Sequence, residues 1–259
     1  MSVELNHRIN GPYDAPVVVF SNSLGSSLEM WAPQVPALSV QYRMLRYDQR
    51  GHGDSPVPPG PYDLADMAQD VLDLLDRNEI ERVHFVGLSM GGATGMWLAA
   101  NAPERIDRLV LLCTSARFGA PEMWIERAAT VREHGVEAVA DAGIGRWFTE
   151  GFREREPAVT ARFRAMMASQ PAEGYAELCG VLERLDLRDD LARIGAPTLM
   201  VSGAQDPSTP PDPDGRLIAD SIPGARFEIL DPAAHLANVE RAELVTELIL
   251  DHLDPEASP

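Results

Sequence analysis

Short, continuously apolar runs alternate along this chain with longer amphipathic stretches. Apolar runs without polar alternation are typical of strands that are buried on both faces of a parallel sheet. Between these runs, residues 64–75 and 244–249 carry apolar side chains at helical spacing. The alternation predicts an α/β fold in which helices flank a mostly parallel central sheet. The predicted strands are residues 17–20, 44–47, 83–86, 109–112, 198–201 and 227–230.

One long segment interrupts this alternation. Residues 117–193 contain no run that resembles a strand, and instead carry Arg/Glu-rich helical stretches with several aromatic side chains. We expect this segment to be a helical cap that is inserted into a single domain of residues 1–259. The alternative is that the segment forms extra helices packed against the sheet.

The charged side chains exclude several kinds of chemistry. All 22 basic residues are Arg, because the sequence contains no Lys, and 40 acidic residues bring the formal net charge to −18. Without a side-chain amine the chain cannot form a Schiff base or provide the lysine of a phosphate-binding loop. The acidic balance also argues against nucleic acid and anionic membrane surfaces as partners, because both are bound by cations.

No segment of the sequence has the pattern of a membrane anchor or a secretion signal. No apolar run approaches the roughly 20 residues of a membrane span. Residues 1–5 lack the basic and apolar regions of a signal peptide. Cys113 and Cys179 lie far apart and belong to no Cys/His cluster. We therefore expect a soluble cytoplasmic protein whose two cysteines are reduced and structural.

The strongest chemical signal is the serine within the sequence GLSMGG, residues 87–92. A predicted strand precedes it, and residues 93–102 are predicted to form a helix. A serine between the two lies on a sharp strand-to-helix turn, where small neighbours relieve crowding. Because that turn raises the hydroxyl above the edge of the sheet, Ser89 is a candidate nucleophile. The alternative is a tight glycine turn with a solvated serine.

A serine nucleophile needs a histidine base that is oriented by a carboxylate. In a fold of this kind the carboxylate and then the histidine follow the serine along the chain. Asp206 comes directly after one predicted strand, and His235 follows the next. The carboxyl ends of parallel strands share one edge of a sheet, so Ser89, Asp206 and His235 are expected to converge there.

Other aspartates and histidines fit these two roles less well. Asp206 is preferred over other nearby aspartates because it directly follows a strand. The remaining histidines lie inside a strand, in a glycine loop or away from strand ends, which favours structural or solvated positions. The competing residues are Asp212, Asp214, Asp231, His7, His52, His84, His134 and His252.

Ester hydrolysis through a serine also needs amide donors for the oxyanion. Such folds use the amide after the nucleophile and one amide from the loop after an early strand. Here these are the amides of Met90 and of Leu24, which lies in the sequence SNSLGS. Small residues in that loop let the backbone approach a ligand. Asn22 and Ser23 could add polar contacts, although a loop rich in Ser and Asn is equally an ordinary turn.

Taken together, these motifs resemble those of the α/β-hydrolases over nearly the whole chain. More narrowly, the chain resembles the 3-oxoadipate enol-lactonases of aromatic catabolism. This resemblance rests on SNSLG at residues 21–25, where most relatives have a His-Gly pair, and on the sequences at residues 97–105 and 235–240. A minor departure is Ala237, where those enzymes often have Ser. The family motifs are SNSLG at residues 21–25, DQRGHG at residues 48–53 and GLSMGG at residues 87–92.

The resemblance implies roles for the candidate residues. Ser89 would be the nucleophile, His235 the base and acid, and Asp206 the carboxylate that orients His235. The amides of Leu24 and Met90 would form the oxyanion hole. The implied protein is a cytoplasmic enzyme without cofactor or metal, which hydrolyses the lactone ester of 3-oxoadipate enol-lactone to 3-oxoadipate.

The small anionic lactone that the resemblance implies carries a carboxylate beside its ring. Arg suits bidentate contacts with a carboxylate, and in so acidic a protein the cation must be a local one. The predicted cap offers Arg117 and Arg146 for this contact, with Trp124 and Trp147 as further substrate-binding candidates. The alternative is a solvated helix face for each Arg, and the core of the cap for each Trp.

Two rival functions stay open from the sequence. A carboxylesterase or C–C bond hydrolase would share the fold and the triad but act on another small substrate. A noncatalytic relative that binds small molecules as a receptor would also share the fold. The presence of all three triad residues argues against this second rival, although some receptors retain them.

Overall fold

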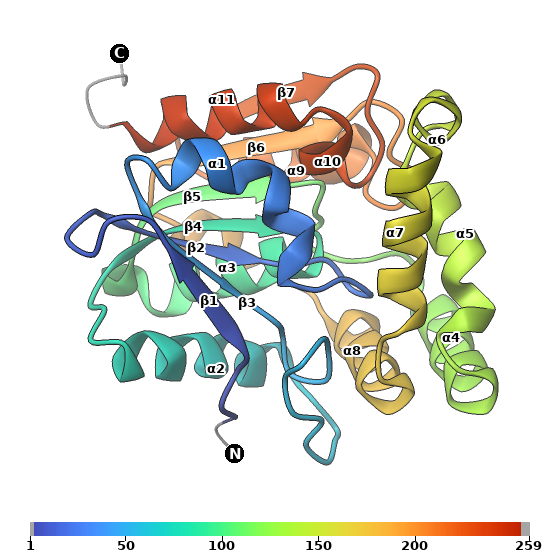
Figure 1. Cartoon of the computed structure of the whole chain (residues 1–259). Helices are drawn as coiled ribbons and strands as arrows, with labels where there is room; N and C mark the ends of the chain where they lie inside the picture. The colour runs from blue at the N-terminus through green and yellow to red at the C-terminus, as the bar shows by residue number, and fades with distance from the viewer. Residues whose placement is uncertain (1–2, 255–259) are drawn as a thin grey trace.

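The computed structural model describes residues 3–254, so residues 1–2 and 255–259 of the predicted domain lie outside it. Within the described residues, seven strands form one sheet in the order β1-β3-β2-β4-β5-β6-β7 (Figure 1). Only β1 runs antiparallel to its neighbour, so the mostly parallel sheet is confirmed. The strands are β1 (His7–Asn10), β2 (Val17–Ser21), β3 (Arg43–Tyr47), β4 (Val83–Leu88), β5 (Ile106–Leu112), β6 (Thr198–Gly203) and β7 (Arg226–Leu230).

All six predicted runs form strands, which are β2 to β7 in chain order. β5 begins three residues before its predicted run, and its early residue Asp107 forms an ion pair with Arg82 at 3.0 Å. β1 has no counterpart among the predicted strands. Its four residues are exposed or partly buried, because an edge strand that pairs only with β3 needs no continuous apolar run.

Helices cover both faces of the sheet, as predicted. In Figure 1, α1 and α11 cover one face, and α2 and α3 cover the other. α2 begins with a capping box, in which Asp63 and Asp66 each accept a backbone N–H of this first turn. The flanking segments are η1 (Leu28–Gln34), α1 (Val35–Leu38), α2 (Leu64–Arg77), α3 (Met90–Asn101), η2 (Pro103–Arg105), η3 (Leu191–Arg193), η4 (Pro211–Gly215), α9 (Arg216–Ser221), α10 (Ala237–Glu240) and α11 (Ala242–Leu253).

The segment between β5 and β6 forms the predicted helical cap. No strand occurs at residues 117–193, all of which the structure describes. α4 packs along α8 and α5 along α7, and Figure 1 shows these helices as a layer beside the sheet. Trp147 and Phe148 both pack edge-on against Phe163, with ring centroids 6.3 and 5.4 Å apart. The cap helices are α4 (Pro121–His134), α5 (Glu137–Trp147), α6 (Glu150–Arg155), α7 (Pro157–Ala168) and α8 (Ala172–Arg184).

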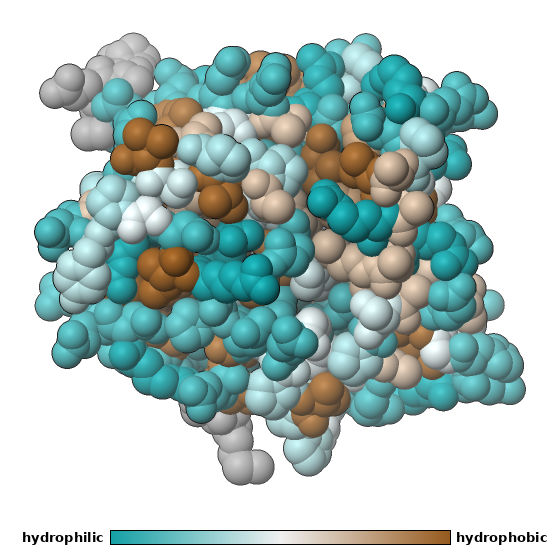
Figure 2. All heavy atoms as spheres, viewed as in Figure 1, coloured by the Kyte–Doolittle hydropathy of each residue, from teal (hydrophilic) through white to brown (hydrophobic). Residues whose placement is uncertain are grey.

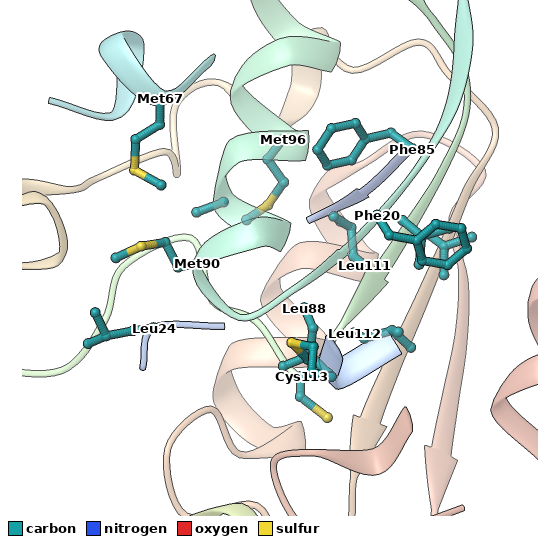
Figure 3. Packing of buried hydrophobic residues seen from close by; sticks show 14 of the residues in the cluster. Phe20, Leu24, Met67, Phe85, Leu88, Met90, Met96, Leu111, Leu112 and Cys113 are labelled. Atoms are coloured by element: carbon teal, nitrogen blue, oxygen red, sulfur yellow. The ribbon is translucent and has the colours of Figure 1, made fainter. Parts of the chain in front are cut away.

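The hydrophobic core lies between the sheet and its helices. Figure 3 shows Phe85 of β4 and Met96 of α3 among the buried side chains of this core. α3 approaches the sheet closely at Gly95, where a Cβ atom would lie 2.8 Å from the Phe85 ring. Figure 2 shows hydrophilic residues over most of one face, with apolar residues gathered where α10 meets α6 and α7. No described helix is long and apolar enough to cross a membrane.

Candidate active site

Ser89 lies on the strand-to-helix turn between β4 and α3 and has left-handed backbone angles, φ 58° and ψ −117°. Such angles are costly for a residue with a side chain, so the surrounding structure must hold them. Two glycines make the turn possible. A Cβ atom on Gly87 would lie 2.2 Å from the carbonyl oxygen of Gly91, and one on Gly91 would lie 2.2 Å from that of Ser21. The predicted turn is therefore present, with Ser89 at its apex.

Hydrogen bonds from three neighbouring segments fix this turn. The Ser89 amide donates to the carbonyl of Leu112 at 2.9 Å, and Thr114 Oγ1 donates to the Ser89 carbonyl at 2.6 Å. The Gly91 amide donates to the carbonyl of Asn22 at 3.0 Å, which ties the turn to the loop after β2. These bonds hold the strained backbone of the turn. None of them uses the Ser89 hydroxyl, which therefore remains available for chemistry.

His235 and Asp206 form a buried pair beside Ser89. His235 Nδ1 lies 2.8 Å from Asp206 Oδ2, and both side chains are less than 5% exposed. The Asp206 carboxylate also accepts from the amides of Ser208 and Thr209 at 2.8 and 3.2 Å and from Thr209 Oγ1 at 2.7 Å. With this carboxylate as the acceptor, the proton belongs on Nδ1, and Nε2 is the nitrogen left to act as a base.

Three of the competing residues from the sequence have other partners. Asp214 accepts from Ser115 Oγ at 2.9 Å and does not contact His235. His84 lies 3.4 Å from Asp107, and His252 contacts the carbonyl of Pro197 at 3.1 Å. Among the described residues, Asp206 is the carboxylate that contacts His235.

The loop after β2 brings Leu24 to the same place. Leu24 lines the cavity that also contains Ser89 and His235. Met90 is the first residue of α3, so its amide has no acceptor within the helix. Ser23 also lines the cavity. The arrangement suits Leu24 and Met90 as the two oxyanion donors.

The Asn22 side chain has a structural role and does not line the cavity. Its side-chain nitrogen donates to the carbonyl of Tyr47 at 2.7 Å, and its side-chain oxygen accepts from Trp31 Nε1 at 3.0 Å. Its carbonyl accepts from Gln49 Nε2 at 2.7 Å as well as from the nucleophile turn. Asn22 therefore orders the oxyanion loop, and its side chain is not available to a ligand.

His52, which the sequence suggested as a structural or solvated residue, also holds the oxyanion loop. Its Nε2 accepts from the Gly25 amide at 2.8 Å, so its Nδ1 carries the proton and donates to the Gly51 carbonyl at 2.9 Å. Its ring stacks on that of Tyr175 in the cap. Burial lowers the pKa of His52 to about 4, which keeps the ring neutral and able to accept at physiological pH.

This pKa predicts a pH dependence of stability. An unfolded His52 takes up a proton below pH about 6.5, whereas the folded one does so only near pH 4, so stability is lost as pH falls between these values. The loss from His52 alone should be about 3 kcal/mol. We expect urea unfolding at pH 7 and pH 4.5 to show a correspondingly smaller pH effect in His52→Gln, whose amide can replace both hydrogen bonds. The same substitution at exposed His134 is the control, and an equal pH effect in His52→Gln and wild type would contradict the prediction.

Beside His52 the core and the cap touch through two glycines. Gly51 has φ +75°, a conformation that favours glycine, and a Cβ atom on it would lie 2.7 Å from Gly174 Cα. A Cβ atom on Gly174 of α8 would lie 2.0 Å from the Gly51 carbonyl oxygen. The two backbones are therefore packed against each other without space for any side chain.

The cavity beside Ser89 has a volume of about 200 Å³ and lies between the sheet edge and the cap. Three of the four predicted cap residues line it, namely Trp124, Trp147 and Arg146. Trp124 donates from its ring nitrogen to the Phe118 carbonyl at 2.6 Å, so its ring is fixed in the wall. The rest of the cavity lining is largely apolar. Its polar side chains are those of Ser23, Ser89, Tyr175, Ser208 and His235 and two guanidinium groups.

These guanidinium groups belong to Arg127 and Arg146. The Arg127 guanidinium lies 4.9 Å from the centre of the Trp124 ring. Burial, and then the nearby positive charge of Arg127, lower the pKa of Arg146. Among the described residues, neither Arg forms an ion pair with a carboxylate. Two partly buried like charges without a counter-ion favour an anionic ligand in the cavity.

Arg117, the fourth predicted cap residue, lies outside the cavity. Its side chain is exposed, and its backbone N–H and carbonyl both bond Ser115 Oγ, in a turn that directs Phe118 into the cavity instead. The sequence reasoning did not select Arg127. The signal that could have identified it is its position three residues after Trp124 in a predicted helix, which places both side chains on one face.

Both cysteines are buried and unpaired, as expected from their spacing. Burial raises the pKa of the Cys113 thiol strongly and that of Cys179 to about 12. Neither thiol is therefore ionised near neutral pH, and neither competes with Ser89 as a nucleophile.

Comparisons with known proteins identify the family of this chain. Residues 16–242 match the alpha/beta hydrolase fold family. The 3-oxoadipate enol-lactonase 2 of Acinetobacter baylyi is 41% identical over 93% of this chain and 90% of its own length. The crystal structure of the enol-lactonase from Burkholderia xenovorans LB400 is 47% identical, with a TM-score of 0.95 over 97% of this chain and 96% of that one.

A more distant structure is that of a thermophilic esterase from Thermogutta terrifontis with malate bound. It is 30% identical to this chain, with a TM-score of 0.90 over 96% of this chain and 92% of that one. The family match and the curated relative each span most of the chain, and the solved structures share its whole fold. This chain therefore belongs to the alpha/beta hydrolase family.

Proposed function

We propose that this chain is a carboxylic ester hydrolase that opens the lactone ring of 3-oxoadipate enol-lactone to give 3-oxoadipate, in the catabolism of aromatic compounds. One observation carries the proposal. The cavity that holds Ser89 and the base His235 also holds Arg127 and Arg146, which no described carboxylate neutralises. A nucleophile at one place and a cation pair at another suit an ester whose acyl chain carries a carboxylate. The similarity to two enol-lactonases supports this substrate.

The first half of the proposed reaction acylates the serine. Ser89 Oγ attacks the ring carbonyl carbon while His235 Nε2 accepts the hydroxyl proton, and Asp206 stabilises the imidazolium that forms. The carbonyl electron pair moves onto oxygen, where the amides of Leu24 and Met90 bind it. Each such donor contributes about 3 kcal/mol where this has been measured. Collapse breaks the ring C–O bond, and the released enolate stays attached to the acyl group.

The second half releases the product. The enolate takes up the proton that His235 accepted from Ser89 and becomes the ketone of the acyl chain, which leaves His235 neutral again. His235 then removes a proton from water, whose oxygen attacks the acyl carbon, and Ser89 leaves with the proton returned by His235. The distal carboxylate stays beside Arg127 and Arg146 throughout, so both steps use one binding position.

The direct test is hydrolysis of 3-oxoadipate enol-lactone by the purified protein, followed by loss of lactone absorbance and identification of 3-oxoadipate. A fluorophosphonate, which modifies activated serines, should label Ser89 in the same preparation. Labelling of Ser89 without turnover of the lactone would contradict the proposed substrate but would still support a serine hydrolase. Absence of both from a folded protein would overturn the enzymatic proposal and favour a binding protein.

A second candidate is an esterase for small esters that carry a carboxylate. It is favoured by the malate bound to the similar thermophilic esterase, since malate carries two carboxylates. A panel of p-nitrophenyl esters compared with the enol-lactone separates the two candidates through their kcat/KM values. Cytoplasmic location stays a prediction from the sequence.

A further inference from the structure

The loop that carries His235 is held by one backbone hydrogen bond on each side of the histidine, of which one goes to the cap and the other to α10. The amide of Leu236, directly after His235, donates to the carbonyl of Trp147 in the cap at 2.9 Å. The amide of Ala234, directly before His235, donates to Glu240 Oε2 at 3.1 Å. The backbone on either side of the base is therefore fixed by two different acceptors.

The Glu240 carboxylate continues from this loop to the cap. Oε2 accepts from the Thr149 amide at 3.3 Å, and Oε1 accepts a short hydrogen bond from Thr149 Oγ1. The same hydroxyl caps α6, because it accepts from the Phe152 amide at 3.2 Å. One carboxylate thus joins the backbone beside His235 to the first turn of a cap helix.

The cap segment held in this way is part of the cavity wall. Trp147, two residues before Thr149, lines the cavity beside Ser89 and packs on Phe163 inside the cap. A shift of residues 147–149 relative to the sheet must therefore move the His235 backbone as well.

We infer that Glu240 is a positioning residue, which holds the His235 loop and the Trp147 wall as one unit. The inference rests on the proposed function in taking His235 as the base for Ser89. Without the Glu240 carboxylate, the Ala234 amide and the Thr149 amide both lose their acceptor. The His235 ring then keeps its Asp206 partner, and the Leu236 amide keeps its bond to Trp147, but the backbone before His235 loses its acceptor. A misplacement of the base by about 1 Å can cost about 100-fold in rate.

The first experiment compares Glu240→Ala with Glu240→Gln in the full-length protein. The Gln amide oxygen can accept from both backbone amides, and its nitrogen can donate to Thr149 Oγ1, so this variant keeps the bonds and removes the charge. The readouts are the second-order rate constant for fluorophosphonate labelling of Ser89, and kcat and KM for the enol-lactone. Glu243→Ala, which removes an exposed glutamate from α11, is the matched control.

We expect Glu240→Ala to lower the labelling rate and kcat by about 10- to 100-fold, with KM changed by less than about threefold. Glu240→Gln should remain within about threefold of wild type in both rates. Equal labelling of Glu240→Ala and wild type would overturn the inference. A loss in Glu240→Gln as large as that in Glu240→Ala would also overturn it, since the charge rather than the bonds would then be responsible.

A second pair of variants removes the Thr149 hydroxyl, and with it both the bond to Glu240 and the cap of α6, in case Glu240→Ala does not fold. Thr149→Val removes the hydroxyl and Thr149→Ser restores it. Thr160→Val is the control, because within residues 3–254 the Thr160 hydroxyl bonds only the carbonyl of Glu156, the N-cap of its own helix. We expect slower labelling of Ser89 in Thr149→Val, recovery in Thr149→Ser and no change in Thr160→Val, and a wild-type rate in Thr149→Val would overturn the bridge to the cap.

These outcomes are distinct from failure of the proposed function. The labelling rate reports activation of Ser89 and does not depend on which ester is the substrate. A wild-type protein that labels at Ser89 but ignores the enol-lactone leaves the Glu240 test intact. If the fluorophosphonate does not label Ser89 in the wild-type protein, His235 is not acting as its base. Both the inference and the proposed function are then overturned.

Discussion

Ser89→Ala should lower hydrolysis of the enol-lactone by about a million-fold, to the residual rate that the cavity and its amides supply without a nucleophile. The hydroxyl is the atom that bonds to the acyl carbon, and no described thiol or hydroxyl at the apex of this turn can replace it. The measurement is kcat/KM with the purified variant, at enzyme concentrations high enough to detect the remaining activity.

The Ser89→Ala variant should remain folded. Alanine has the same Cβ atom, and the bonds that hold the turn come from the backbone of residue 89. An unchanged melting temperature is the control. Asp206→Asn, which disturbs the proton on His235 Nδ1 without removing the side chain, should cost about 10⁴-fold. Lactone hydrolysis by Ser89→Ala at more than a thousandth of the wild-type rate would show that another group is the nucleophile.

Replacing both cavity arginines should remove the preference for an anionic substrate. We expect Arg127→Met with Arg146→Met to lower kcat/KM for the enol-lactone by about 100- to 1000-fold, since hydrogen bonds to charged groups contribute about 1.5–3 kcal/mol each. The neutral lactone 5-methyl-2(3H)-furanone has the same enol-lactone ring without the carboxylate. Its kcat/KM should change by less than about fivefold, so the ratio of the two substrates is the measurement.

Arg117→Met is the matched control for the double variant. This exposed Arg lies outside the cavity, so its replacement should leave the ratio of the two substrates unchanged. The same fall for the neutral lactone in the double variant would contradict a carboxylate contact and indicate loss of the cap structure instead. A changed ratio in Arg117→Met alone would move the anion contact to the mouth of the cavity.

Periodicity and chain order predicted most of the framework. Strands buried on both faces must be continuously apolar, so β2 to β6 were visible in the sequence. Both edge strands are half exposed, and β7 was visible only because it carries Phe227, Ile229 and Leu230, whereas β1 has Ile9 as its one apolar residue. Ser89, Asp206 and His235 were predictable because the edge of a parallel sheet collects the residues that directly follow its strands. Asn22 and His52 were not assigned their actual bonds, since both act through backbone groups of other loops.

The cap was harder to predict than the sheet. Its helical content follows from composition, but its helices meet through a mixed set of apolar contacts that no single period describes. Arg117 and Arg127 look alike in the sequence, and only the turn at Ser115 and the face shared with Trp124 separate them. The chemistry of the expected ligand therefore predicts which residue types the cavity needs. The packing of the cap decides which residues of each type line it.

The contact between Gly51 and Gly174 has a consequence for engineering. Because neither position has space for a Cβ atom, this contact fixes how closely α8 of the cap approaches the loop after β3. A cap transplanted from a relative will pack against this sheet only if its last helix has a glycine at the position equivalent to Gly174. Libraries that vary substrate preference should accordingly diversify α4 and α5 and leave the start of α8 unchanged.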